Sequence, residues 1–155
     1  DPESLEGSIA GAMGYGQFMP DSYRKYAVDF DSDGVRDILT NPVDAIGSVA
    51  NFLSKKGGWK PNTPIAIEAR SVSNQTTFKS QFKPYMTLIE LNKIGLEPKE
   101  KISGNLKFVP ISLELDEGYE HWLGFENYYS LSRYNRSKLY VMAVIEFSRS
   151  LSIYL

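Results

Sequence analysis

The period of the apolar residues changes twice along this chain, and that change limits its folds more than any other sequence feature. Apolar residues recur every three or four positions over 43–53 and again over 140–151, the period of a helical face. Over 60–125, stretches of apolar residues alternate with polar or small ones, as in strands with one wet face. The sequence therefore predicts an α+β fold: residues 1–59 and 126–155 are helical parts, and 60–125 form an inserted antiparallel β subdomain.

Both helical stretches carry further signals. Asn41 suits an N-cap, Pro42 suits the first helical position, and Gly57 and Gly58 supply a stop. The predicted apolar face of this first helix consists of Val43, Ile46, Ala50 and Leu53. In the last helix the corresponding residues are Tyr140, Val144, Phe147 and Leu151. Residues 139–145 are apolar on nearly every side, which predicts a centrally buried helix.

Three segments of the middle stretch are predicted strands. Residues 65–69 and 111–116 alternate between apolar and other side chains, and 86–91 is a third candidate. Residues 75–84 are polar and predict a loop.

Composition excludes several classes of function. The net charge of −2 gives no basic face for nucleic acid, and the absence of cysteine excludes disulfides and thiolate zinc sites. The longest apolar runs fall far short of the roughly 18 residues that span a bilayer. His121 is the only histidine and lies in a strand-like segment, so we expect a structural role for it. We expect a monomer.

Residues 11–20 read Gly-Ala-Met-Gly-Tyr-Gly-Gln-Phe-Met-Pro, with three glycines in six positions. Glycines allow tight turns and close approach of a ligand. No Lys-Ser or Lys-Thr follows them, so a phosphate-binding loop is excluded. From physics alone the segment is a Gly-rich helix junction that presents Gln17, and close packing of helices is the simpler explanation of its glycines.

An acidic loop follows. Asp29, Asp31 and Asp33 occupy positions 1, 3 and 5 of an EF-hand-like pattern, and the carbonyl of Val35 falls at position 7. Position 12 is a threonine, so we expect Asp44 to close the site instead. An acidic turn without an ion is the alternative, but three neighbouring carboxylates repel one another. We therefore expect structural Ca²⁺, with magnesium or sodium as alternatives.

Asp44 also has a local alternative. It lies three residues after Asn41, where a carboxylate can cap the free N–H groups of a helix, and both roles can hold together.

The Gly-rich string resembles the Gly-Ala-Met-Gly-x-x-Gln-Phe-Met-Pro signature of the membrane-bound lytic murein transglycosylase B family, which are lysozyme-like lytic transglycosylases. Other strings resemble the same family at both helical ends of the chain, whereas the middle matches only weakly. They are Ser8-x-Ala10, Asp21-Ser22-Tyr23, the ten residues 42–51, Trp122-Leu123-Gly124, Asn127-Tyr128-Tyr129 and Arg133-Tyr134-Asn135-x-Ser137.

The resemblance implies a lysozyme-like helical core formed by both chain ends. It also implies non-hydrolytic cleavage of the MurNAc-β-1,4-GlcNAc bond in peptidoglycan. One glutamic acid protonates the leaving oxygen and then, as a carboxylate, accepts the proton of the sugar's own C6 hydroxyl. That hydroxyl oxygen attacks the anomeric carbon and gives a 1,6-anhydroMurNAc end. The family's lengthened calcium loop is closed by the Asp of Pro-x-Asp, here Asp44. The implied location is the periplasm, either free or as an outer-membrane lipoprotein.

The same resemblance assigns supporting residues but no catalytic Glu. The family's acid lies well upstream of the Gly-rich motif, and Glu3 and Glu6 are too near that motif to match it. We therefore expect this chain to begin after the acid and to be inactive alone. By motif, Ser8 orients the catalytic carboxylate and Gln17 contacts the sugar. Three further residues line the glycan cleft, namely Tyr134, Asn135 and Tyr140.

Structural roles for these residues stay open: Ser8 can be a cap and Tyr140 can be core. Two other functions also stay open. One is a non-catalytic calcium-binding module that binds peptidoglycan. The other is an EF-hand signalling domain, against which the single, atypical loop counts.

Overall fold

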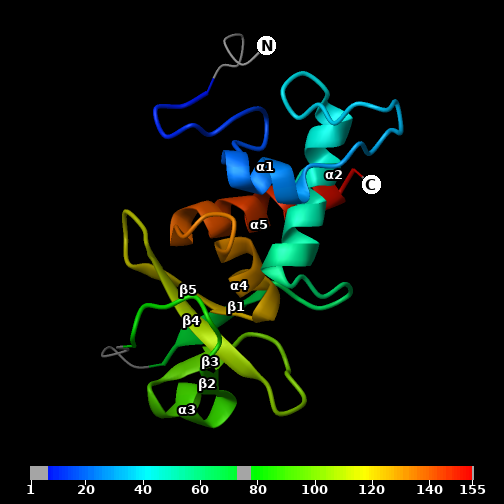
Figure 1. Cartoon of the computed structure of the whole chain (residues 1–155). Coiled ribbons are helices and arrows are strands. Elements are labelled where there is room, and N and C mark those ends of the chain that lie inside the picture. Colours follow the sequence, from blue (N-terminus) through cyan, green and yellow to red (C-terminus); the bar gives the residue numbers. More distant parts are fainter. Residues whose placement is uncertain (1–6, 73–77, 155) are drawn as a thin grey trace. The chain divides into compact units, whose positions relative to one another are not determined.

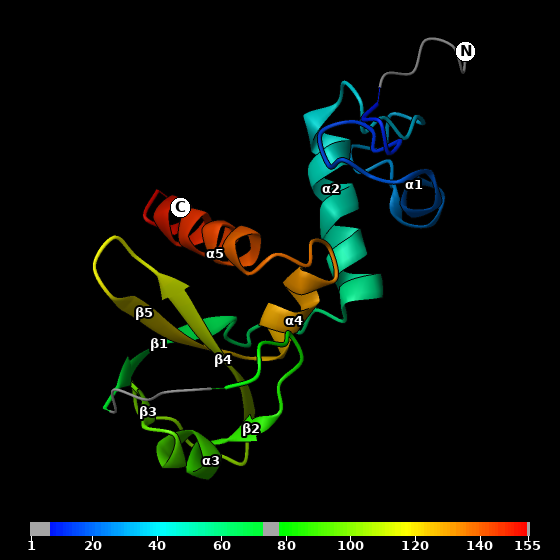
Figure 2. The same ribbon diagram turned by 90° about the vertical axis from the view of Figure 1, so that its left-hand side faces the viewer.

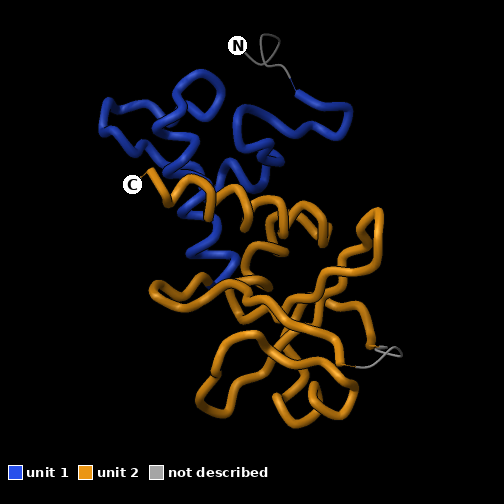
Figure 3. Tube along the Cα trace, turned by 180° about the vertical axis from the view of Figure 1, so that it is seen from behind, with its two compact units in different colours: residues 1–58 blue, residues 59–155 orange. Residues whose placement is uncertain are grey.

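The computed structural model describes residues 7–72 and 78–154, so Glu3, Glu6 and positions 75–77 of the predicted loop lie outside the described residues. The chain divides into two compact units, residues 1–58 and 59–155, which are coloured separately in Figure 3. Each unit is described by itself below.

The described residues of unit 1 form two α-helices. They are α1 (Pro20–Tyr26) and α2 (Pro42–Phe52), and α2 continues into a π-helical turn, η2 (Leu53–Gly57). The side chain of Asn41 accepts hydrogen bonds from the backbone of Val43 and Asp44, and Pro42 opens the helix. Gly58, with φ of 74°, ends the helical run in the left-handed conformation. The predicted start and stop of this helix are confirmed.

The predicted apolar face of α2 is wrong. Val43 and Ile46 are 43% and 70% exposed, and the buried face instead carries mostly small or polar residues. The reason is the loop before the helix, which crosses that face at close range. A Cβ atom on Gly47 would lie 2.4 Å from the ring of Phe30. The hydroxyl of Ser48 accepts the backbone N–H of Val28 at 3.0 Å.

The core of unit 1 is small and partly aromatic. The ring of Phe52 lies 5.8 Å from that of Phe18 and 5.1 Å from that of Tyr26, between centroids. Ile38, at 1% exposed, is buried as well. Most of the other residues of this unit are in loops. Polar contacts must therefore supply part of the stability that a larger apolar core would provide.

Unit 2 is built on an antiparallel sheet, as predicted. Its strands, in the spatial order β2-β4-β5-β1-β3, are β1 (Ala66–Ser71), β2 (Met86–Thr87), β3 (Leu96–Pro98), β4 (Lys107–Glu114) and β5 (Tyr119–Gly124) (Figure 1). The register pairs Trp122 with Ile111 on one side and Leu123 with Ile67 on the other. The predicted strands at 65–69 and 111–116 correspond to β1 and to the second half of β4.

The third predicted strand, 86–91, is wrong beyond its first two residues. Only Met86 and Thr87 pair with β4, and Leu88–Lys93 forms helix α3. A capping box starts this helix: the hydroxyl of Thr87 accepts the N–H of Glu90, while the Glu90 carboxylate accepts the N–H of Thr87 at 2.7 Å. The Thr-x-x-Glu spacing was readable in the sequence and outweighs the strand-like apolar run.

Helices cover the sheet on both sides. In Figures 1 and 2, α4 (Glu126–Ser132) and α5 (Lys138–Ser152) lie on one side, and α3 lies on the other. Arg149 ties α5 to the sheet, since its guanidinium lies 4.6 Å from the Trp122 ring and donates to the carbonyl of Ala66 at 2.9 Å. The main buried cluster consists of Ile67, Ala69, Leu91, Leu96, Phe108, Leu123 and Phe125.

Helix α5 is apolar on two faces, and only one of them is buried. Its buried residues are Val141, Met142 and Ile145. The predicted face is largely exposed, with Phe147 at 66% and Tyr140 at 39%. The prediction of a helix buried on all sides is therefore wrong for the residues that the structure describes. Within that part of the chain, no helix is long and apolar enough to cross a membrane.

Candidate functional site

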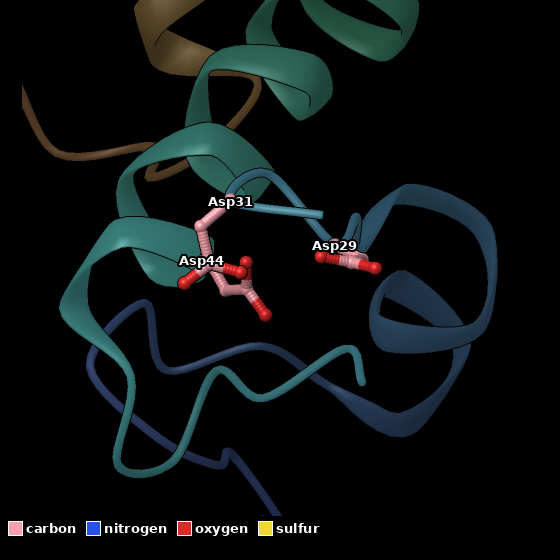
Figure 4. A group of neighbouring side chains, drawn as sticks. All are labelled: Asp29, Asp31 and Asp44. Carbon is pink, nitrogen blue, oxygen red and sulfur yellow. The ribbon is translucent and has the colours of Figure 1, made fainter. Parts of the chain in front are cut away.

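Three carboxylates converge in unit 1. Asp29 and Asp31 come from the acidic loop, and Asp44 comes from the first turn of α2 (Figure 4). One oxygen from each lies within 4.8 Å of the others. The structure thus brings together three of the five predicted metal ligands.

Asp44 anchors this cluster. It is fully buried, and its carboxylate accepts the backbone N–H groups of Asp37 at 2.8 Å and Phe30 at 2.7 Å. These two backbone donors hold the pKa of Asp44 below its usual range, so its carboxylate is ionised at neutral pH. The cap of α2 is Asn41, so Asp44 serves the loop and not the end of its own helix.

The loop is already folded around the three carboxylates. Asp29 accepts the N–H of Gly34 at 2.8 Å, and the side-chain amide of Asn41 donates to Asp31 at 2.8 Å. Gly34 has φ of 91°, and Ser32 has φ of 65°, a conformation that costs a non-glycine residue free energy. Such a turn aims several oxygens at a common point.

The donor set fits a hard divalent cation. Two oxygens that share a Ca²⁺ at 2.3–2.6 Å each are separated by at most roughly 5 Å. The 4.8 Å limit on the oxygens of Asp29, Asp31 and Asp44 meets this condition. Asp33 lies outside this group, and its carboxylate accepts the N–H of Val35 at 2.8 Å. Ligation by Asp33 and by the carbonyl of Val35 stays a prediction.

The Gly-rich segment folds as a tight turn before α1. Met13 and Phe18 close it with two backbone hydrogen bonds of 2.9 Å. Gln17 is exposed at this turn with φ of 46°, and both its backbone N–H and its side-chain amide donate to the carbonyl of Gly14 at 3.0 Å. The predicted contact residue is therefore presented to solvent in a fixed orientation.

Ser8 belongs to a local turn in the structure. Its hydroxyl accepts the N–H of Ala12 at 3.0 Å, and its own N–H donates to the carbonyl of Ala12 at 2.9 Å. Among the described residues no helix begins at this turn, so the bond is local and Ser8 is not a helix cap. Orientation of a catalytic carboxylate by Ser8 stays a prediction.

In unit 2 the structure brings together two of the predicted glycan-contacting residues. The rings of Tyr134 and Tyr140 stack with centroids 6.4 Å apart and an interplanar angle of 13°. Burial, with a smaller contribution from Tyr140, raises the pKa of Tyr134 to about 12, so its hydroxyl stays protonated. Asn135 lies exposed beside them, on the connection between α4 and α5. Flat amphipathic rings with a nearby amide suit a sugar face.

His121 has a structural setting. Its Nδ1 lies 2.7 Å from the hydroxyl of Ser112 on the neighbouring strand, and its ring stacks on Tyr119. Partial burial lowers its pKa, which favours the neutral ring at neutral pH.

Sequence reasoning missed the residues that organise the acidic loop. Asp37 accepts hydrogen bonds from the N–H groups of Leu39 and Thr40 and from the Thr40 hydroxyl. An aspartate followed three residues later by threonine is typical of such turns and could have indicated it. The bond from Asn41 to Asp31 joins residues ten positions apart, and no local signal indicates it.

An antiparallel sheet flanked by helices, a turn that presents a glutamine and an acidic loop are the features expected from the resemblance to lytic transglycosylases. The family model described as the transglycosylase SLT domain matches residues 1–149, and this chain belongs to that family. The resemblance stated from the sequence is thereby confirmed.

Individual relatives agree. The chain is 40% identical to membrane-bound lytic murein transglycosylase B of Escherichia coli K12, over 99% of this chain. The structure of E. coli lytic transglycosylase Slt35 in complex with calcium is also 40% identical over 99% of the chain, with a TM-score of 0.89. Catenated SltB1 from Pseudomonas aeruginosa is 40% identical over 99% of the chain, with a TM-score of 0.88.

The chain is short beside these relatives. It spans 41% of the curated E. coli enzyme, 48% of the Slt35 chain and 51% of the SltB1 chain.

Proposed function

We propose that this chain forms the glycan-contacting part of a peptidoglycan lytic transglycosylase. The reaction is non-hydrolytic cleavage of the MurNAc-β-1,4-GlcNAc bond, which leaves 1,6-anhydroMurNAc ends. The observation that carries the proposal is the turn at residues 11–20. It keeps the family's signature string and holds Gln17 outward, in a chain 40% identical to a lytic murein transglycosylase.

The chemistry needs one proton donor and a tethered nucleophile. Because the attacking C6 hydroxyl belongs to the substrate, proximity replaces the second carboxylate of ordinary glycosidases. We propose that the donor is a glutamic acid outside these 155 residues, and that the chain alone binds glycan weakly without cleaving it. Ser8 would then orient that carboxylate.

Two parts of the chain would hold the glycan. Gln17, with its amide nitrogen engaged by Gly14, is left with an amide oxygen that can accept from a sugar hydroxyl or acetamido N–H. Tyr134 and Tyr140 would stack on sugar faces, and Asn135 would supply hydrogen bonds.

We propose structural Ca²⁺ at the acidic loop. Asp29, Asp31 and Asp44 would hold it, with Asp33 and the Val35 carbonyl completing the set. The fit of the three carboxylates supports this, and so does the calcium complex of the relative Slt35. When bound, the ion would neutralise the acidic loop and stabilise unit 1, away from the chemistry. Magnesium or sodium would be the alternative outcomes of a binding titration.

Relatives also support the partner. Slt35 was solved with bulgecin A, and SltB3 of P. aeruginosa was solved with NAG-anhNAM-pentapeptide. We propose peptidoglycan strands as the partner, the periplasm as the location and a monomer as the active form. A lysozyme-like core to which this chain contributes, and attachment of the whole protein to the outer membrane, are part of the same proposal.

A binding titration separates the residue roles. The probe is a reduced GlcNAc–MurNAc tetrasaccharide, titrated into the chain by calorimetry or NMR. Replacing Gln17 with Gly, or Tyr134 with Ala, should weaken binding at least ten-fold. The control, Tyr119→Ala on the exposed β5 end, should change it less than two-fold. Equal effects of all three variants would overturn the assignment.

A non-catalytic, calcium-bound peptidoglycan-binding module is the second candidate. It would use the same proposed glycan contacts and the same acidic loop. The two candidates differ in one result, cleavage by a longer form of the protein.

A further inference from the structure

The Gly-rich turn of unit 1 is fastened to the segment that follows the acidic loop. The backbone N–H of Tyr15 donates to the carbonyl of Ile38 at 3.0 Å. At Gly14 the two segments are so close that an added Cβ would lie 2.2 Å from that same carbonyl oxygen. Gly14 also has φ of 65°. Only glycine combines this conformation with this approach.

Gly14 in turn fixes Gln17. A single carbonyl, that of Gly14, accepts both the backbone N–H and the side-chain amide of Gln17, each at 3.0 Å. Gln17 adopts φ of 46°, which a side-chain-bearing residue keeps only where its surroundings impose it. The orientation of the amide therefore depends on where Gly14 is held.

The far end of this chain of contacts is Asp44. Its carboxylate accepts the N–H of Asp37, the residue before Ile38, at 2.8 Å, and its other oxygen accepts the N–H of Phe30. Direct contacts and single peptide bonds thus connect Asp44 through Asp37 and Ile38 to Gly14 and Gln17.

We propose that Gly14 and Ile38 are positioning residues for Gln17, and that Asp44 couples the acidic loop to the glycan contact. This inference rests on the proposed function, because it takes Gln17 to touch the glycan. A cation held by the loop would then raise glycan affinity without touching the glycan, since Asp44 belongs to both arrangements.

A matched pair of glycines tests the positioning role. Gly11 and Gly14 have φ of 79° and 65°, but an added Cβ meets nothing within 4 Å at Gly11. Alanine at either site imposes comparable backbone strain, and only Gly14→Ala meets the Ile38 carbonyl. We expect Gly14→Ala to weaken tetrasaccharide binding at least ten-fold and Gly11→Ala less than two-fold. Equal losses would overturn the positioning role.

Amide hydrogen exchange in the unmodified chain tests the coupling even if Gly14→Ala fails to fold. Removing calcium with a chelator should speed exchange of the Tyr15 N–H about ten-fold and shift the side-chain NH₂ resonances of Gln17. The Phe18 N–H, bonded to Met13 at the base of the turn, is the internal control and should change less than two-fold. Unchanged exchange at Tyr15, or equal changes at Tyr15 and Phe18, would overturn the coupling.

Gln17→Gly separates the glycan contact from its support. It keeps a residue that accepts positive φ and removes the amide, so binding should fall while calcium-dependent exchange at Tyr15 is retained. The exchange experiment uses no glycan. A chain that binds no tetrasaccharide but shows the calcium effect at Tyr15 would overturn the proposed function alone. A chain that binds glycan without that effect would overturn only the coupling.

Discussion

The internal contacts that stabilise unit 1 differ in kind from those that stabilise unit 2. Unit 2 packs a sheet between helices around buried apolar side chains such as Phe108, Leu91 and Leu123. In unit 1, carboxylates accept the N–H groups of loop backbone, and Asp29, Asp37 and Asp44 alone account for much of the loop structure. The stability of unit 2 therefore depends on buried apolar area. The stability of unit 1 depends on a few carboxylates and on any cation that neutralises them.

The largest expected effect lies in the core of unit 2. Phe108 is 1% exposed, and its ring meets that of Phe125 at 5.2 Å. Phe108→Ala should lower the free energy of unfolding by about 4 kcal/mol, through lost burial and the cavity left behind. Both tryptophans lie in unit 2, so tryptophan fluorescence in a urea titration measures it. Recovery of this loss by added calcium would contradict the comparison.

The next largest effect is expected at the anchor of the acidic loop. Asp44→Ala leaves the N–H groups of Phe30 and Asp37 without their acceptor and should lower the Tm of unit 1 by about 10 °C. The melt is followed by NMR of unit 1 amides. The control is Asp21→Ala, since the Asp21 side chain is 71% exposed and forms an ion pair with Lys25 on the surface, with an expected shift under about 2 °C. Similar shifts for both variants would remove the special role of Asp44.

Calcium should stabilise unit 1 but not unit 2. A ligand at 100 times its Kd stabilises the folded state by about 2.7 kcal/mol, so chelation should lower the Tm of unit 1 and leave tryptophan-reported unfolding of unit 2 in place. Asp29→Ala should lower the Tm of unit 1 chiefly when calcium is present. If Asp29→Ala lowers the Tm of unit 1 by the same amount with chelator as with calcium, the loop does not bind the ion through Asp29.

The smallest expected effect is the pH dependence of unit 2. Burial lowers the pKa of His121, so the unfolded chain takes up a proton near pH 6.5 before the folded chain does. Stability from the neutral ring is thus present above pH 6.5 and is lost as pH falls below 6.5 through the lowered pKa of the folded state. Because the ring is only partly buried, we expect this loss to be the smallest of those described. His121→Gln should reduce the change in the urea midpoint between pH 7 and pH 5. An unchanged pH dependence of the midpoint would contradict this.

The sequence predicted features that rest on local rules. Asn41 and Pro42 start α2, Gly58 ends the helical run, and the alternation around Ile111 marks β4. The approach of Asp29 and Asp31 was also predictable, because they occupy alternate positions of one loop. Asp44 is more distant in the chain, and it was predicted from the threonine at position 12 and from the family resemblance.

What the sequence could not predict depends on contacts between distant residues. The buried face of α2 is set by Phe30 lying on Gly47, and no helical period reveals that contact. The strand predicted at 86–91 is a different case. Thr87 and Glu90 carry the capping-box signal for the helix at Leu88–Lys93, and the prediction overlooked it. Gly14 lies against the Ile38 carbonyl, which is more than twenty positions away, and no local signal in the sequence indicates that contact.

The most direct test of the account is digestion of purified peptidoglycan sacculi. The 155-residue chain is compared with a version extended upstream to the length of its curated relative, with products identified by mass spectrometry. The account predicts 1,6-anhydromuropeptides from the extended version alone. Anhydro products from the short chain would place the acid at Glu3 or Glu6. Reducing-end products, or none from either version, would contradict lytic transglycosylase chemistry.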